Sequence, residues 1–163
     1  MWKWATLILL VTLLMVVFSE NRDELGERFR SESLRYRDVL LLRASAAGNR
    51  RAVGVLVRLG ADVGARDAQE RSPLALAAGG GHAGVASALL RAGAEVDACD
   101  RWGNTPLFLA ADAGRPAAVE ILLAADADPQ ARNMFDWTAR RVAEFRGHHE
   151  TARLLPEPPA DEP

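Results

Sequence analysis

One stretch of this chain occurs twice at a fixed spacing, and that repetition constrains the fold more than any other feature. The segment Ser72-Pro73-Leu74-Ala75-Leu76-Ala77-Ala78 returns 33 residues later as Thr105-Pro106-Leu107-Phe108-Leu109-Ala110-Ala111. Each copy is followed by a glycine, by an apolar run that ends in two leucines, and by an Ala-x-x-x-Ala segment. A period of this length predicts a solenoid, in which similar units stack on one another.

Each copy carries the local signals of two helices. Ser72 and Thr105 are N-cap residues, and the proline after each stands at the first helical position, where its missing N–H costs no hydrogen bond. Gly79-Gly80-Gly81 is expected to form a turn between the two helices of its unit. The second helix has one apolar stripe in each copy, formed by Val85, Leu89 and Leu90, and then by Val119, Leu122 and Leu123. Gly93 and Asp126 follow these helices and suit a left-handed cap.

Degraded copies lie on both sides of the two clear ones. The four predicted units are residues 35–67, 68–100, 101–133 and 134–155. Ser33 or Asp38 is expected to start the first helix, with Tyr36, Val39 and Leu42 buried. Extra Arg and Glu residues in the first and last units predict terminal caps with a polar outer face.

The pattern resembles the ankyrin repeat, whose family consensus reads G-x-T-P-L-H-x-A-A, then G-H, L-L and G-A-D-V-N. The resemblance implies an all-α repeat solenoid of about four helix-turn-helix units, preceded here by one hydrophobic N-terminal helix. It also implies β-turn fingers near residues 96–104 and 129–137. Ala75 and Phe108 replace the consensus His, so the hydrogen bond that this His makes in the family is absent.

The N-terminal residues predict a targeting segment. Residues 4–18 carry no charge and follow Lys3, so 1–19 is interpreted as a signal-anchor or a signal peptide. A retained anchor would be shorter than the usual span of about 17–25 residues. A cleaved signal would end at Ser19. Residues 20–34 are expected to form a polar spacer, and residues 156–163 a disordered tail.

The orientation of such a segment follows from the charges beside it. Lys3 favours a cytoplasmic N-terminus, which places the repeats outside the cytoplasm, whereas several arginines between Arg22 and Arg37 oppose that orientation. Lys3 is the only lysine, and with abundant Ala this usage indicates a GC-rich, bacterial genome. We therefore expect an inner-membrane protein with extracytoplasmic repeats, or a periplasmic protein if cleavage follows Ser19.

Composition and motifs argue against several function classes. A formal net charge of −2 gives no reason to expect nucleic-acid binding. Cys99 is the only cysteine, so neither an internal disulfide nor a cysteine-based metal site is available. His82 and His148 occupy the Gly-His position of the repeat, where a structural role is expected. The sequence predicts no catalytic residue, cofactor, metal or small-molecule substrate, and the chain is expected not to be an enzyme.

Surface recognition of an unidentified protein partner is the function that remains. In ankyrin-type binders the contacts come from the finger tips and the exposed side of the first helix of each unit. The corresponding candidates here include Trp, Phe and Arg, the residue types that anchor interfaces. They are Arg101, Trp102, Asn104, Asp112, Met134, Phe135, Trp137, Phe145 and Arg146.

Two alternatives stay open for these residues. Trp102 and Phe135 could instead pack on neighbouring fingers, and Trp137 could cover the last unit. The equivalent positions of the second unit are mostly small, so the strongest contacts are expected in the C-terminal half. At the level of function, the alternative to an adaptor is a membrane-proximal spacer or self-assembly module without a dedicated ligand.

Overall fold

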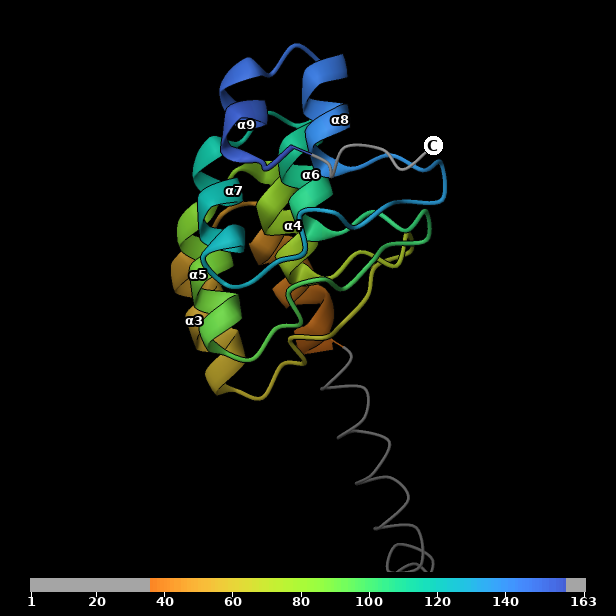
Figure 1. The fold of residues 1–163 in the computed structure, drawn as a ribbon. Coiled ribbons are helices and arrows are strands. Elements are labelled where there is room, and N and C mark those ends of the chain that lie inside the picture. Colours follow the sequence, from red (N-terminus) through yellow and green to blue (C-terminus); the bar gives the residue numbers. More distant parts are fainter. Residues whose placement is uncertain (1–35, 158–163) are drawn as a thin grey trace, which may run out of the picture. The chain divides into compact units, whose positions relative to one another are not determined.

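Short helices joined by turns make up residues 36–157, the part of the chain that the computed structural model describes (Figure 1). A helix of residues 36–46 comes first, and no strand occurs within the described range. The helices that follow are α3 (Arg50–Arg58), α4 (Pro73–Gly80), α5 (Ala83–Arg91), α6 (Pro106–Asp112), α7 (Pro116–Leu123), α8 (Ala139–Phe145) and α9 (His149–Leu154). The all-α prediction is therefore confirmed. The predicted N-terminal helix and polar spacer lie outside the described residues.

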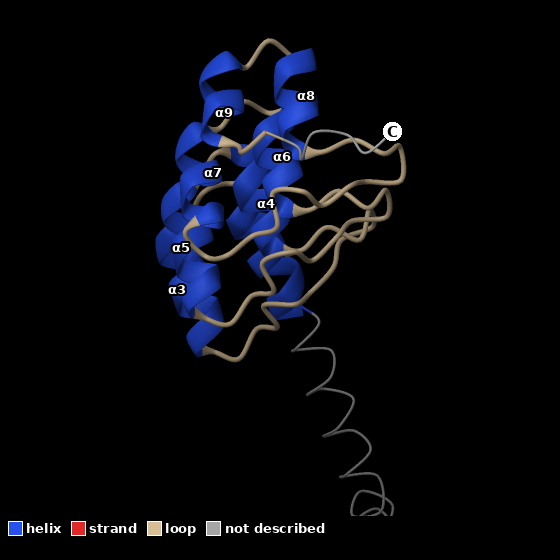
Figure 2. Ribbon diagram, viewed as in Figure 1, coloured by secondary structure: helices blue, strands red, loops and turns tan. Residues whose placement is uncertain are grey.

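The helices stack in two layers. Helices α4, α6 and α8 contact one another in turn, and α3, α5, α7 and α9 form the second layer in the same order (Figure 1). Within each unit the two helices also pack together, as α6 does with α7. The loops that connect successive units project to one side of the stack (Figure 2). This arrangement is a repeat solenoid. Between residues 36 and 157, no helix is long and apolar enough to cross a membrane.

Leucine and alanine fill the space between the layers. Leu74 and Leu107 are fully buried on the first layer, and Leu89 and Leu122 are fully buried on the second. The alanines of the repeated motif are buried as well, so neighbouring helices approach closely. Each fully buried leucine contributes about 1.5–3 kcal/mol relative to exposure. The predicted apolar stripes are confirmed.

Side-chain caps start the helices of the first layer. Ser72 Oγ accepts a hydrogen bond from the Ala75 N–H at 3.1 Å, and Thr105 Oγ1 accepts one from the Phe108 N–H at 3.2 Å. Thr138, which no proline follows, caps α8 in the same way at 3.3 Å. Such a cap stabilises a helix by about 1 kcal/mol. The two capping predictions are confirmed.

Backbone angles at the helix ends confirm one expectation and correct another. Gly93 and Asp126 adopt φ values of 87° and 62°, the left-handed conformation expected of them. The Gly79-Gly80-Gly81 turn is shorter than predicted, because Gly79 and Gly80 belong to α4 and only Gly81 has a positive φ, 76°. Because residues 79 and 80 continue the helix, one residue in the left-handed conformation is enough to end it.

The start of the solenoid differs from the prediction. Asp38 does not begin the first helix, because residues 36 and 37 are already helical; its Oδ1 instead accepts a hydrogen bond from the Asp62 N–H at 2.8 Å. Leu41 and Leu42 are buried, whereas Tyr36 and Val39 are exposed. The helical register explains this, since Leu41 rather than Val39 faces the next unit.

The surfaces at the two ends of the stack differ. Exposed Val39, Val55 and Leu59 lie on the first unit, which also has an apolar hollow of about 720 Å³ lined in part by Leu40 and Leu56. Exposed Arg43 and Arg51 line the same hollow, so the outer face of this unit is polar only in part.

At the other end, ion pairs lie on the last unit, which also has exposed Met134, Phe135 and Phe145, so its surface is polar only in part. Arg140 lies 2.8 Å from Glu144 and 3.2 Å from Glu157, and it donates to the Leu155 carbonyl at 2.9 Å. Pro156 and Glu157, the first residues of the predicted tail, are thus described, and Glu157 is held against α8. The rest of that tail lies outside the described residues.

Two histidines link successive units at the ends of first-layer helices. His82 Nε2 lies 3.0 Å from the Ala46 carbonyl oxygen, and His148 Nε2 lies 3.1 Å from that of Asp112. Because a carbonyl only accepts, the ring nitrogen must carry the proton. A Cβ on Gly48 or Gly114 would lie 2.5 or 2.6 Å from these rings, so the two glycines make room for them. Both histidines have the structural role expected from the sequence.

This packing predicts a difference between two glycine substitutions. Gly114→Ala and Gly93→Ala both place a side chain at positive φ, which costs about 1 kcal/mol. Only Gly114→Ala also displaces the His148 ring, so it should lower the free energy of unfolding by about 2–3 kcal/mol in total. Chemical denaturation of the two variants measures this difference. Adding His148→Ala should reduce the gap, and equal losses in Gly93→Ala and Gly114→Ala would refute the account.

Candidate binding groove

Three loops project from the stack as hydrogen-bonded fingers. Each is closed by an N–H that donates to the carbonyl four residues later: Asp67 to Arg71 at 3.1 Å, Asp100 to Asn104 at 3.0 Å, and Asn133 to Trp137 at 3.1 Å. The last two lie within the fingers predicted near residues 96–104 and 129–137. The loops therefore have a defined backbone, which fixes where their side chains point.

An Asp or Asn at the base of each finger holds the tip from inside. Asp100 Oδ1 accepts hydrogen bonds from the N–H groups of Trp102 and Asn104, both at 2.9 Å. Asn133 Oδ1 accepts from those of Phe135 and Trp137, both at 3.0 Å. A side-chain oxygen that accepts a hydrogen bond from the N–H two residues further on mimics a backbone turn. The sequence reasoning missed this role, although the recurrence of Asp67, Asp100 and Asn133 at 33-residue spacing was available as a signal.

The fingers are also bonded to one another. The Met134 N–H donates to the Trp102 carbonyl at 3.0 Å, and Asn133 Nδ2 donates to Asn104 Oδ1 at 2.9 Å. The Arg101 N–H donates to the Gln69 carbonyl at 3.2 Å in the same manner. Neighbouring fingers therefore form a stack that is continuous with the stacked helices.

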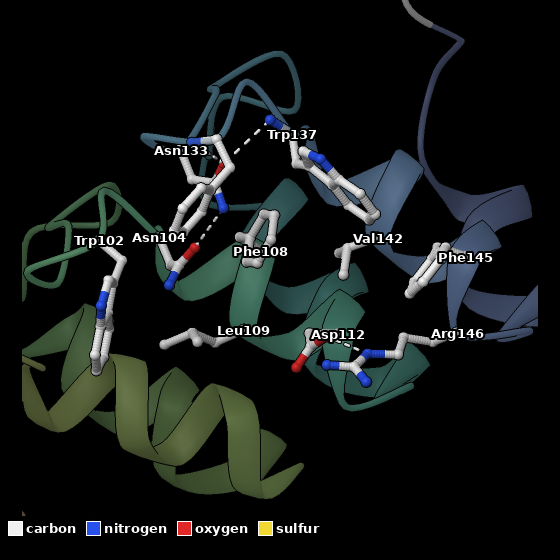
Figure 3. Close-up of a pocket in the computed structure, with 11 residues that line it drawn as sticks. Trp102, Asn104, Phe108, Leu109, Asp112, Asn133, Trp137, Val142, Phe145 and Arg146 are labelled. Carbon is white, nitrogen blue, oxygen red and sulfur yellow. Dashed lines mark hydrogen bonds and ion pairs between the residues drawn. The ribbon is translucent and has the colours of Figure 1, made fainter.

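A groove of about 580 Å³ runs between the last two fingers and helices α6 and α8 (Figure 3). Phe108 and Leu109 of α6 and Val142 of α8 supply apolar surface, and Trp102 and Trp137 enter from the fingers on either side (Figure 3). The lining residues are Trp102, Asn104, Phe108, Leu109, Asp112, Asn133, Phe135, Trp137, Val142, Phe145 and Arg146.

Most of the residues proposed from the sequence meet in this groove. It is lined by Trp102, Asn104, Asp112, Phe135, Trp137, Phe145 and Arg146, whereas Arg101 and Met134 lie outside the lining. The part that these nine residues play in binding stays a prediction. Sequence reasoning missed Phe108, Leu109, Asn133 and Val142. Leu109 and Val142 are equivalent positions in successive units, which would have pointed to them.

The aromatic residues of the groove differ in how firmly they are packed. Trp137 is half-buried against the core and meets Phe145 edge to face, with ring centroids 5.1 Å apart. Trp102, Phe135 and Phe145 are 38%, 63% and 73% exposed. Trp137 thus fits the packing alternative, while the exposure of Phe135 argues against its packing on a neighbouring finger. Large exposed aromatic residues gathered in one hollow are typical of interaction sites.

Charged groups surround the aromatic residues. Arg146 Nε lies 2.7 Å from Asp112 Oδ1, which joins α8 to α6 across the groove (Figure 3). The guanidinium carbons of Arg101 and Arg141 lie 5.4 and 5.1 Å from the ring centroids of Trp102 and Trp137, at cation–π distance. The groove is therefore apolar with a charged rim.

Two groups outside the groove have shifted pKa values. Burial opposes ionisation of Asp67, but hydrogen bonds from Arg71 and Gln69 and the charge of Arg71 outweigh it and lower the pKa of Asp67. Burial, together with Asp100 and Asp97, raises the pKa of the Cys99 thiol, which lowers its reactivity as a thiolate. In the part of the chain that the structure describes, no cluster of His, Cys, Asp and Glu could hold a metal ion.

Comparison with known proteins identifies a family. A family model described as ankyrin repeats, in three copies, matches residues 41–133. No curated protein matches the chain. The family match covers the first three helix pairs, and the groove lies across the end of that region and the α8–α9 pair that follows.

The packing of the two tryptophans predicts opposite mutational effects. Trp102→Ala should change the free energy of unfolding by about 1 kcal/mol or less, because Trp102 does not pack against the core cluster, as Trp137 does. Trp137→Ala should cost about 2–3 kcal/mol, because it removes core packing and the contact with Phe145. Denaturation curves measured on both variants test this. A loss in Trp102→Ala as large as that in Trp137→Ala would show that Trp102 is a packing residue.

Proposed function

Because this chain belongs to the ankyrin-repeat family, whose members generally mediate protein–protein interaction, we propose that it is a non-catalytic adaptor that binds a partner protein through this groove. The observation that carries the proposal is the exposure of Trp102, Phe135 and Phe145 in a single hollow. Aromatic side chains in a preformed concavity lose little conformational entropy when a partner covers them. Repeats of this family are typically interaction modules without catalytic activity.

The alternative function, a spacer or self-assembly module, rests on a different surface. The exposed Val39, Val55 and Leu59 and the apolar hollow of the first unit would be covered if two copies met at that end. We place this alternative second, because the hollow carries none of the aromatic anchors that the groove has.

We further propose that residues 4–18 attach the chain to the bacterial inner membrane with the repeats outside the cytoplasm. The uncharged run and Lys3 before it support this location. If cleavage follows Ser19, the repeats would instead be released into the periplasm. These residues lie outside the described part of the chain.

Photocrosslinking in living cells tests the proposed binding face. Benzoylphenylalanine in place of Phe135 should give an adduct with a second protein, because this side chain is exposed in the groove. The same group in place of Glu120, which is exposed on α7 in the second layer, is the matched control. The adducts are read by immunoblotting and mass spectrometry. Adding Trp102→Ala should reduce the adduct formed at position 135.

Other crosslinking outcomes would count against the adaptor. Equal adducts from positions 135 and 120 would mean that contact is not specific to the groove. An adduct made only of two copies of this chain would favour self-assembly.

A reporter fusion tests the location. Alkaline phosphatase fused after Pro163 should be active, because this enzyme folds only where disulfides form. It should also sediment with membranes, because the proposed anchor holds the chain there. Activity in the soluble fraction on a shortened chain would instead identify Ser19 as a cleavage site. An inactive reporter on a membrane-bound chain would place the repeats in the cytoplasm and refute the proposed orientation.

A further inference from the structure

The charges around the groove are not balanced, although the whole chain is slightly acidic, with a formal net charge of −2. Three arginines, Arg101, Arg141 and Arg146, stand at or beside the groove residues, and Asp112 is the one carboxylate in its lining. The local excess of positive charge therefore belongs to the groove and not to the composition of the chain.

Nearby carboxylates are already engaged within the described structure. Asp136 pairs with Arg132 at 2.9 Å, and Glu144 pairs with Arg140 at 2.8 Å. Asp100 accepts hydrogen bonds from the finger that it closes. These groups do not compensate the arginines of the groove.

Two of those arginines, Arg101 and Arg141, form no ion pair within the described residues, and Arg146 pairs only with Asp112. Arg141 lies over the Trp137 ring and forms no ion pair with any described residue, and Arg101 lies over Trp102. Arg146 is held through Nε by Asp112, and within the described residues its two terminal nitrogens have no hydrogen-bond partner. A guanidinium whose orientation is set in this way can accept a carboxylate with little further loss of side-chain entropy.

From this geometry we infer that the groove recognises an acidic amphipathic protein segment, in which a large apolar side chain is flanked by carboxylates. The inference rests on the proposed function and specifies the chemistry of the partner. The apolar anchor would pack on Leu109, Phe108 and Val142 between the exposed aromatic rings. The carboxylates would meet Arg141 and Arg146 at the rim. A nucleic-acid strand fits less well, because Asp112 lies in the lining and repels phosphates.

Selection from a random peptide library tests the inference. The full chain, embedded in lipid nanodiscs, would be used to select phage-displayed 12-residue peptides. The enriched peptides should combine Leu, Ile, Phe or Trp with Asp or Glu. Their binding should weaken as the salt concentration rises.

Two sets of variants separate the charge of the groove from the charge of the protein. The double variant Arg141→Gln, Arg146→Gln should weaken binding of an enriched peptide by about tenfold. Arg91→Gln, Arg153→Gln removes the same charge from α5 and α9 in the second layer and should leave binding unchanged. Asp112→Asn should have the opposite effect and strengthen binding, because it removes the carboxylate that competes for Arg146.

The outcomes distinguish the partner chemistry from the proposed function. Peptides whose binding is lost in the Phe135→Ser variant, but which are not enriched in Asp or Glu, would overturn the inference. They would leave the adaptor function standing. Equal weakening by the two double variants would overturn it as well. Binding of a fluorescein-labelled 12-residue oligouridylate with no enrichment of any peptide would overturn both.

Discussion

The fold depends on apolar contact between units that cannot stand alone. Each helix pair buries leucine and alanine against the next pair in both layers, as Leu74 and Leu107 do in one and Leu89 and Leu122 do in the other. A solenoid of this kind has nearest-neighbour contacts only, so each junction contributes separately to stability. The hydrogen bonds of His82 and His148 add a polar link at the first and last junctions, whereas the middle junction has Arg115 at the equivalent position. Each end unit lacks one neighbour and so keeps an open outer face, which has an apolar hollow in the first unit and the Arg140 ion pairs in the last.

Stacking of the helices also determines the geometry of the fingers. Because successive units are related by a small, regular step, the finger backbones come within hydrogen-bonding distance and tie Trp102 to Met134. Asp100 and Asn133 then direct the following aromatic residues from inside each loop. The fingers on both sides of the groove are thus held by hydrogen bonds. In the proposed function, such preformed fingers would leave little ordering for the partner to impose.

The sequence predicted the parts of this structure that repeat. Capping residues, buried stripes and the left-handed Gly93 recur with the period, so a local rule stated once applies again in the next unit. Errors arose where the period degrades. Val39 was expected to be buried and is exposed, because without the Ser-Pro signal the register of the first helix was ambiguous. In the groove, the exposed finger residues were predicted from their residue types, because Trp, Phe and Arg anchor interfaces. Leu109 and Val142 were missed because an apolar position on a helix is expected to lie in the core, and Val142 is indeed buried although it also lines the groove.

The aromatic border of the groove exists because equivalent positions carry aromatic side chains in the C-terminal units and not in the second unit. Along the first layer the series runs Gly79, Asp112, Phe145, and along the finger tips it runs Gln69, Trp102, Phe135. The N-caps of α4 and α6 have the same backbone angles, so the change in surface along these series comes mainly from the side chains. A hollow between small residues would offer a partner little apolar surface. The same hollow bordered by Trp102 and Phe145 exposes apolar surface whose contact with water is unfavourable. A repeat that is uniform in its core and varied on one face can therefore carry the proposed binding site at one end without disturbing the contacts that hold the solenoid together.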